Sequence, residues 1–212
     1  MNKTPLISVI SIFILMFSLT LLSGCSDNND DNNDIIEESS EETVLETDKT
    51  ALLFMLEEEK LARDTYMYLD NIWSINQFAN IQKSEQTHMD AIENLLIKNN
   101  IEYSLLPIGE FENETLQGLY DQFIIDGKTD QASALQIGAT IEDLDIVDLQ
   151  IHINETNNVE IASVFESLRC GSRNHLRSFV SNIEKEGNTY TPQFLTQDAY
   201  NLIVSSDSEK CN

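Results

Sequence analysis

Apolar side chains recur every three or four residues along four long stretches of the sequence, a spacing typical of amphipathic helices. The four predicted helices cover about residues 50–71, 74–99, 131–153 and 159–187. Ser74, followed three residues later by Gln77, predicts a capping box at the start of the second helix. Gly187 is the residue expected to end the fourth helix. The pattern therefore predicts an all-α fold.

The lengths of the connections predict how these helices are arranged. Short connections join the first helix to the second and the third to the fourth, so each pair is expected to be antiparallel. Residues 101–130 form a connection too long for a tight turn. It contains a predicted short helix over 113–126, closed by Gly127. A long crossover lets the third helix run in the same direction as the second, which is the ferritin-like variant of the four-helix bundle.

Each of the four apolar stripes is interrupted by polar side chains near its middle. In chain order they are Glu59, Glu85, His88, Glu142, Asp145, Ser172 and His175. A bare carboxylate in a bundle core costs several kcal/mol, so these carboxylates would repel one another unless cations lie between them. Carboxylate and imidazole together are the ligands expected for iron or manganese, and less selectively for zinc. The pattern favours a metal site.

A metal-free core is the alternative. Arg63, Arg173 and Arg177 could neutralise the carboxylates in a buried ion-pair network. A single Glu-x-x-His also occurs by chance on solvated helix faces. Four interruptions at the same depth of four helices are much harder to attribute to chance, and they favour the metal site.

The N-terminal segment predicts targeting rather than a fold. Residues 6–22 are almost entirely apolar, and the following Ser23-Gly24-Cys25 resembles the lipobox of a prokaryotic lipoprotein signal. Cleavage of a signal peptide over 1–24 would leave Cys25 lipidated at the new N-terminus. An uncleaved membrane anchor is the alternative. Both interpretations place the rest of the chain at the cell envelope, outside the cytoplasm and tethered to a membrane.

Charge separates the chain into a tether and a domain. Residues 25–48 are rich in Asp and Glu and contain no Lys or Arg, so we expect a disordered acidic tether. Residues 49–212 then form one bundle domain with a C-terminal tail. The whole chain has 37 Asp and Glu against 12 Lys and Arg, a formal net charge of −25. Such a charge repels phosphate backbones and excludes nucleic-acid binding.

The polar residues of the stripes resemble those of the ferritin-like superfamily. The stretch 59–66 is similar to the first-helix ligand motif of rubrerythrins, and Glu85-Gln-Thr-His88 matches their second-helix Glu-x-x-His. Glu142-Asp-Leu-Asp145 is similar to the third-helix Glu-x-x-Glu. From residue 49 to about 200 the chain more closely resembles a largely uncharacterised ferritin-like family, domain of unknown function 2202. The resembling stretches are 57–64, 84–91, 141–149, 171–177 and 190–195.

The resemblance implies a dinuclear carboxylate site that holds two iron ions. Glu59 would be a terminal ligand, Glu85 a bridge, and His88 a ligand of the first metal. Glu142 and His175 would bind the second metal.

One residue departs from the family pattern. The fourth helix usually supplies Glu-x-x-His, and Ser172 stands here in place of the Glu. Asp145 projects beside Glu142 and would compensate for the missing carboxylate; the alternative is a second metal that is weakly bound or absent. Tyr66 and Arg63 are further candidates for the surroundings of the ligands, together with Ser172.

The cysteines limit the accompanying chemistry. If Cys25 is lipidated, Cys170 and Cys211 remain, and an oxidising exterior would permit a disulfide between them. The sequence contains no Cys-x-x-Cys, so no rubredoxin-like iron module accompanies the bundle. A peroxidase of the rubrerythrin kind would therefore need an outside electron donor.

Three classes of function are compatible with the sequence. The first is a di-metal oxidase, ferroxidase or peroxide-reducing protein that reacts with dioxygen or peroxide in iron handling or oxidative defence. The second is a protein that sequesters or relays metal without turnover. The third is a metal-free structural or interaction module. A homodimer is left open, whereas a membrane tether on each subunit would obstruct a closed storage shell.

Overall fold

The computed structural model describes residues 44–211. The predicted signal peptide, Cys25 with its predicted lipidation, and the predicted tether up to residue 43 lie outside the described residues. Residues 46–48, predicted as the end of the tether, instead form the start of the first helix. Within 44–211 the chain forms six helices and no strand, so the prediction of an all-α fold is confirmed. The helices are α1 (Glu46–Trp73), α2 (Asn76–Lys98), α3 (Glu114–Gly127), α4 (Gln131–Glu155), α5 (Val159–Lys185) and α6 (Gln197–Ser205).

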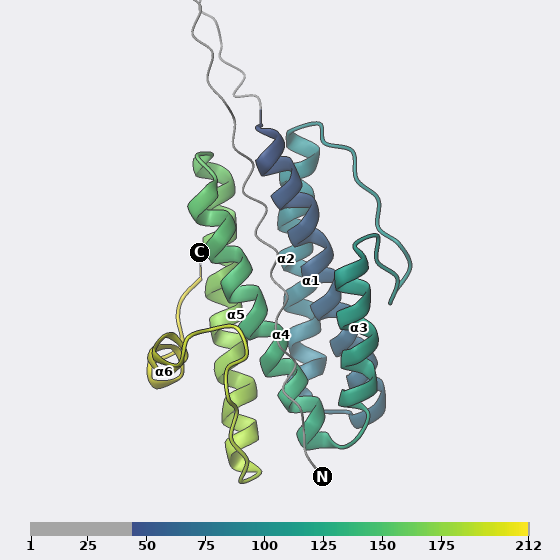
Figure 1. The fold of residues 1–212 in the computed structure, drawn as a ribbon, viewed down its shortest axis with the longest axis vertical. Helices are drawn as coiled ribbons and strands as arrows, with labels where there is room; N and C mark the ends of the chain where they lie inside the picture. The colour runs from purple at the N-terminus through teal and green to yellow at the C-terminus, as the bar shows by residue number, and fades with distance from the viewer. Residues whose placement is uncertain (1–43, 212) are drawn as a thin grey trace, which may run out of the picture. The chain divides into compact units, whose positions relative to one another are not determined.

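The four long helices pack as a bundle of two antiparallel pairs (Figure 1). Helix α1 packs against α2, and α4 packs against α5. Contacts of α1 with α4 and of α2 with α5 join the two pairs. The crossover carries α3, which packs on α1 and α4, and it lets α4 run in the same direction as α2. None of the helices in this part of the chain combines the length and apolar character needed to span a bilayer.

The helix ends show where local sequence signals operate. Gly187 has φ +78° and follows α5 in a Schellman motif, with its N–H bonded to Glu184 O and Asn188 N–H bonded to Ile183 O. The capping box predicted at Ser74 is wrong. Ser74 instead closes α1 in the left-handed region, with φ 51°, and its N–H bonds to Asp70 O. Helix α2 then begins without a side-chain cap.

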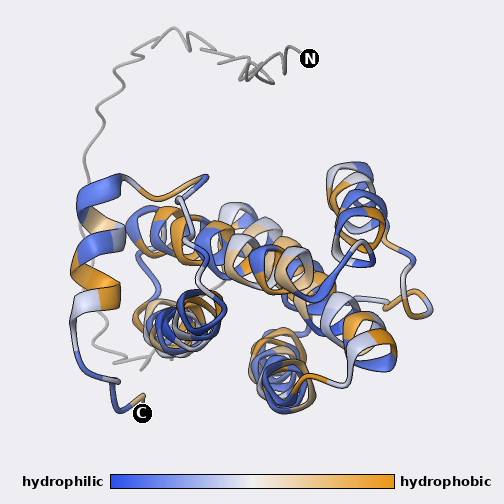
Figure 2. Cartoon of the chain, turned by 90° about the horizontal axis from the view of Figure 1, so that it is seen from below, coloured by the Kyte–Doolittle hydropathy of each residue, from blue (hydrophilic) through white to orange (hydrophobic). Residues whose placement is uncertain are grey.

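The helices are amphipathic, with hydrophobic and hydrophilic bands along each (Figure 2), and their apolar faces form two separate clusters. One cluster contains Tyr66, Phe78 and Phe179. The other contains Met89 and Phe165. In α1, α2 and α5 the polar positions of the stripes fall between the two clusters along the sequence, whereas in α4 Ile146 of the first cluster follows Glu142 and Asp145. The apolar clusters therefore hold the helices together on both sides of a polar layer.

A buried lysine fixes the crossover to α1. The side chain of Lys60 is 1% exposed, and its Nζ donates to Asp64 Oδ2 at 2.7 Å. The same Nζ donates to the carbonyl oxygens of Pro107 and Glu110, each at 3.0 Å. Asp64 also accepts from Gly109 N–H. All three protons of the ammonium group are thus used, which offsets the cost of burying its charge.

A buried carboxylate holds the segment that precedes α6. Asp143 is fully buried in α4 and accepts a hydrogen bond from Tyr190 OH at 2.8 Å. It also accepts from the backbone N–H groups of Gln193, Phe194 and Leu195. Residues 193–195 lie outside a helix, so their N–H groups have no helical carbonyl to bind, and the Asp143 carboxylate accepts their hydrogen bonds instead.

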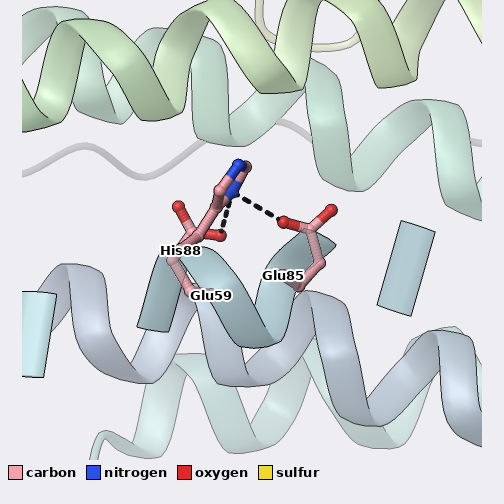
Figure 3. A group of neighbouring side chains, drawn as sticks. All are labelled: Glu59, Glu85 and His88. Carbon is pink, nitrogen blue, oxygen red and sulfur yellow. Dashed lines mark hydrogen bonds and ion pairs between the residues drawn. The ribbon is translucent and has the colours of Figure 1, made fainter. Parts of the chain in front are cut away.

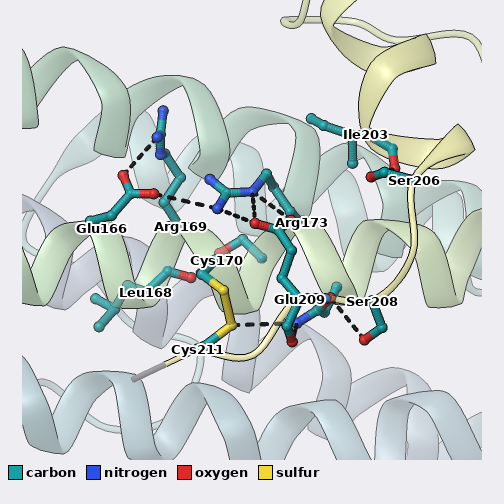
Figure 4. A network of polar contacts seen from close by, with 12 residues as sticks. Glu166, Leu168, Arg169, Cys170, Arg173, Ile203, Ser206, Ser208, Glu209 and Cys211 are labelled. Atoms are coloured by element: carbon teal, nitrogen blue, oxygen red, sulfur yellow. Dashed lines mark hydrogen bonds and ion pairs between the residues drawn. A yellow bond between two sulfur atoms is a disulfide. The ribbon is translucent and has the colours of Figure 1, made fainter.

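The C-terminal tail is attached to α5 by a disulfide and by ion pairs (Figure 4). Cys170 and Cys211 are bonded, with a Cα–Cα distance of 5.6 Å. Arg173 and Arg177 each donate to Glu209, both at 2.6 Å. Hydrogen bonds from these guanidinium groups lower the pKa of Glu209 to about 2.

We predict that Gly138→Ala destabilises the bundle. A Cβ at this position in α4 would lie 2.4 Å from the Phe179 ring, so helix and ring must move apart, at a cost of about 1–3 kcal/mol. Gly118→Ala is the matched control, because a Cβ there meets nothing within 4 Å. That variant should gain up to about 1 kcal/mol from helix propensity. Urea denaturation measures both, and equal effects of the two changes would contradict the close packing at Gly138.

We also predict that the Glu209 ion pairs stabilise the protein only above acidic pH. The folded pKa of about 2 lies below the ordinary value of 4.5, so the stabilisation is present above pH 4.5 and is lost as the pH falls towards 2. Glu209→Gln should lower the free energy of unfolding by about 1–2 kcal/mol at pH 7. The difference from wild type should shrink at pH 3. Asp207→Asn, an exposed carboxylate of the same tail, is the control and should show no such trend.

Candidate metal centre

The polar layer contains two groups of three side chains that could each hold a metal ion. One group is Glu59, Glu85 and His88, and the other is Glu85, Glu142 and His175. Within each group, one potential ligand atom per residue lies within 4.8 Å of the others. Glu85 belongs to both groups. We call them the first and the second triad.

The distances show that Glu85 is shared between the two histidines. In the first triad, His88 Nδ1 is 2.8 Å from Glu85 Oε2 and 3.1 Å from Glu59 Oε2 (Figure 3). In the second triad, His175 Nδ1 is 2.9 Å from Glu85 Oε1 and 3.4 Å from Glu142 Oε2. The histidine rings are stacked, with centroids 5.6 Å apart. Each oxygen of Glu85 therefore faces a different imidazole.

Tyr66 and Ser172 orient carboxylates of the layer. Tyr66 OH donates to Glu142 Oε1 at 2.5 Å and is fully buried. Ser172 Oγ donates to Asp145 Oδ2. Asp145 lies in the layer but belongs to neither triad. Arg63, the third residue expected around the ligands, instead donates to neighbours on α1 and α2 outside the triads.

A glycine permits the approach of α5 to the first triad. A Cβ on Gly171 would lie 2.7 Å from His88 Nε2. The imidazole therefore occupies space that any other residue at position 171 would fill. The glycine itself was the signal in the sequence. A glycine inside a helix costs about 1 kcal/mol relative to alanine, so its presence indicates a close contact at that position.

Burial and mutual charge shift the acid–base properties of the layer. Burial raises the pKa of Glu59 to about 7, and burial with the Glu85 charge raises the pKa of Glu142 to about 7. Burial alone would lower the pKa of His175, but Glu85 and Glu142 raise it to about 10. The two histidines overcome burial at Glu85 and hold its pKa well below the usual range. These shifts show that the carboxylate charges of the layer need compensation, which either protons or bound cations would supply.

Several buried carboxylate oxygens accept no hydrogen bond. These are Glu59 Oε1, Asp145 Oδ1 and both oxygens of Glu58. Glu85 Oε1 and His175 Nδ1, although 2.9 Å apart, are not aligned for a hydrogen bond. Unpartnered buried oxygens are costly, and a bound cation would satisfy them. The donor set therefore fits a metal ion.

The arginines that could have formed a metal-free network are engaged elsewhere. Arg63 donates to Asp64 and Gln86. Arg173 and Arg177 bind Glu209 in the C-terminal tail. Among residues 44–211, no arginine forms an ion pair with a triad carboxylate. The repulsion within the layer is thus not relieved by guanidinium groups.

Sequence reasoning missed two acidic residues beside the layer. Glu58 precedes Glu59 on α1 and is 1% exposed, and Asp148 follows Asp145 by one turn on α4. Both lie off the stripes that the periodicity identified. The run of three glutamates at 57–59 was the available signal, since a solvated acidic run and a partly buried one look alike in sequence.

Comparisons with known proteins identify relatives but no activity. Residues 48–207 match the family described as "Uncharacterized protein domain (DUF2202)". "Uncharacterized protein MJ0754" of Methanocaldococcus jannaschii is 46% identical over 169 residues, which cover 79% of this chain and 91% of that protein. The crystal structure of hypothetical protein MJ0754 matches with a TM-score of 0.77 and covers 78% of this chain and 96% of that one. The chain thus belongs to the DUF2202 family.

Proposed function

We propose that this protein is a ferritin-like metalloprotein whose polar layer binds two metal ions, iron in the first place, with manganese or zinc as the alternatives. Glu59, Glu85 and His88 would hold the first ion. Glu85, Glu142 and His175 would hold the second, with Glu85 as the bridge. The position of Glu85 carries this proposal, because its two buried oxygens face two imidazole nitrogens at 2.8 and 2.9 Å.

We further propose that the bound iron takes part in redox chemistry with dioxygen or peroxide, in iron handling or oxidative defence. Ferrous ions would supply the electrons for such a reduction. The chain itself contributes the orientation of ligands, since Tyr66 holds Glu142 and Ser172 holds Asp145. The apolar clusters on both sides of the layer keep bulk water from the carboxylates.

The location of this activity is proposed from sequence alone. The apolar run at 6–22 and the lipobox-like Ser23-Gly24-Cys25 support an envelope protein held to a membrane by a lipid anchor. The acidic character of the chain supports it as well, because a strong negative field concentrates cations near the surface.

Metal binding without turnover is the second candidate, and one observation favours it. Ser172 occupies the place where a fourth-helix carboxylate is expected, and Asp145 lies outside both triads. The second ion would then have fewer carboxylate ligands than the first. A protein of this kind would sequester or relay metal.

Metal content tests the proposed site. We expect the purified full chain, loaded with ferrous iron without oxygen and then desalted, to retain about two iron ions per chain by elemental mass spectrometry. Glu85→Ala should lose both ions, because both triads share that residue. His88→Ala should retain about one. Glu184→Gln, an exposed carboxylate near the end of α5, is the control and should retain two. If the wild-type protein retained no iron after loading and desalting, and circular dichroism showed its helices intact, metal binding would be refuted.

Oxygen consumption separates the two candidates. If the iron is redox active, the ferrous-loaded protein should consume added oxygen faster than the same amount of ferrous iron does in buffer. His88→Ala should lower that rate by about tenfold or more, since the first triad loses a ligand. Retention of iron together with buffer-like oxygen consumption would exclude the oxidase and leave sequestration or relay.

A further inference from the structure

A second set of buried polar groups lies beside the triads and is not used by the proposed ligands. Its central member is Glu58 of α1, whose side chain is 1% exposed. Neither of its carboxylate oxygens accepts a hydrogen bond from an N–H or hydroxyl group of the described residues, and the carboxyl group of Asp148 lies within hydrogen-bonding reach. A carboxylate in this condition is costly unless a cation or a proton compensates it.

Two acidic residues and a histidine of α4 lie on the side of Glu58. Asp145, Asp148 and His152 follow one another on α4 at spacings of three and four residues, so they project from one helix face. Burial, followed by the charges of Asp145 and Asp148, raises the pKa of Glu58 well above its usual range. Asp148 is half-buried, and its carboxyl group meets that of Glu58. The two carboxyl groups therefore face each other, and His152 is a basic group close enough to act on Asp148.

The outer end of this set opens at the surface. His152 lines a pocket of about 290 Å³ together with Glu46 and Glu155, and no lysine or arginine is part of its lining. His152 Nδ1 is 3.6 Å from Glu155 Oε2. The His152 ring packs near the rings of Phe54 and Phe165, with centroid distances of 5.8 and 6.2 Å. This end of α4 therefore presents a pocket with a largely apolar surface, in which His152 and two glutamates supply the ionisable groups.

The inner end meets the first triad. Asp145 carries one unpartnered oxygen, and burial followed by the charge of Glu59 raises the pKa of Asp145 well above its usual range. Side chains that can bind a cation are therefore arranged in a series. The series begins with His152 at the pocket, continues with Asp148 and Glu58, and ends at the polar layer. Glu58 and Asp148 belong to neither triad, so this pair offers weaker coordination than the layer. A cation held there could move on to the triads.

We propose that Glu58 and Asp148 form a transit position for a divalent cation, on an access route that leads from the pocket at His152 to the triads. This inference rests on the proposed metal site, because a route needs a destination. The route gives a reason for placing two carboxyl groups side by side where burial makes their charges costly. It also assigns His152 a role at the mouth, away from the final ligands.

The rate of metal loading tests the route separately from the site. Cobalt(II) is the probe, because its absorption reports binding without redox chemistry. We expect the double variant Glu58→Gln, Asp148→Asn of the full chain to load about tenfold more slowly in stopped flow. Its final cobalt content should equal that of wild type. Glu184→Gln removes one exposed carboxylate near the C-terminal end of α5, outside the proposed route, and should load at the wild-type rate.

A second variant acts only at the mouth of the pocket. Thr50 is exposed and lines the pocket, so Thr50→Trp should narrow it without changing a buried residue. This variant should also slow loading and leave the cobalt content unchanged. Wild-type rates in both variants would overturn the route. A lower final content in the double variant would overturn it too, because Glu58 and Asp148 would then be permanent ligands. Wild type that binds no cobalt would instead refute the metal site itself.

Discussion

The structure depends on burying a layer of carboxylates in the middle of a helical bundle. Removing such groups from water costs several kcal/mol each, and the arginines of the bundle do not relieve it. Two apolar clusters, one on each side of the layer, supply the burial that holds the helices together regardless. The crossover, the buried Lys60 and the anchored C-terminal tail then fix the helices that carry the layer. The polar layer therefore lowers the stability of the fold, and the apolar clusters offset that cost.

Much of this arrangement was predictable from periodicity. The four long helices and the buried positions of Glu59, Glu85 and Glu142 followed from apolar spacing with polar interruptions. Helix α6 was missed, because nine residues give too few turns for a periodic signal. The capping box at Ser74 failed because that residue serves the end of α1, and local sequence does not reveal which of two adjacent helices a residue serves.

The partners of buried charges were the other part that sequence could not supply. Lys60 and Asp143 look like solvated residues, yet each satisfies backbone groups about fifty residues away. Such pairings depend on tertiary contacts, since the loop that needs a donor or acceptor does not specify which helix provides it. The same reason explains why Asp145 was predicted as a ligand but lies outside the triads, where it binds Ser172.

Gly171 has a consequence for how relatives of this protein should be compared. The distance between α2 and α5 at the first triad depends on a missing methyl group, because a Cβ there would displace the His88 ring. A relative could keep every ligand of both triads and still hold its histidine elsewhere if it carried alanine at this position. The placement of the candidate ligands is therefore encoded partly by a residue that has no side-chain ligand atom, so a relative that shares the ligand motifs need not share their arrangement.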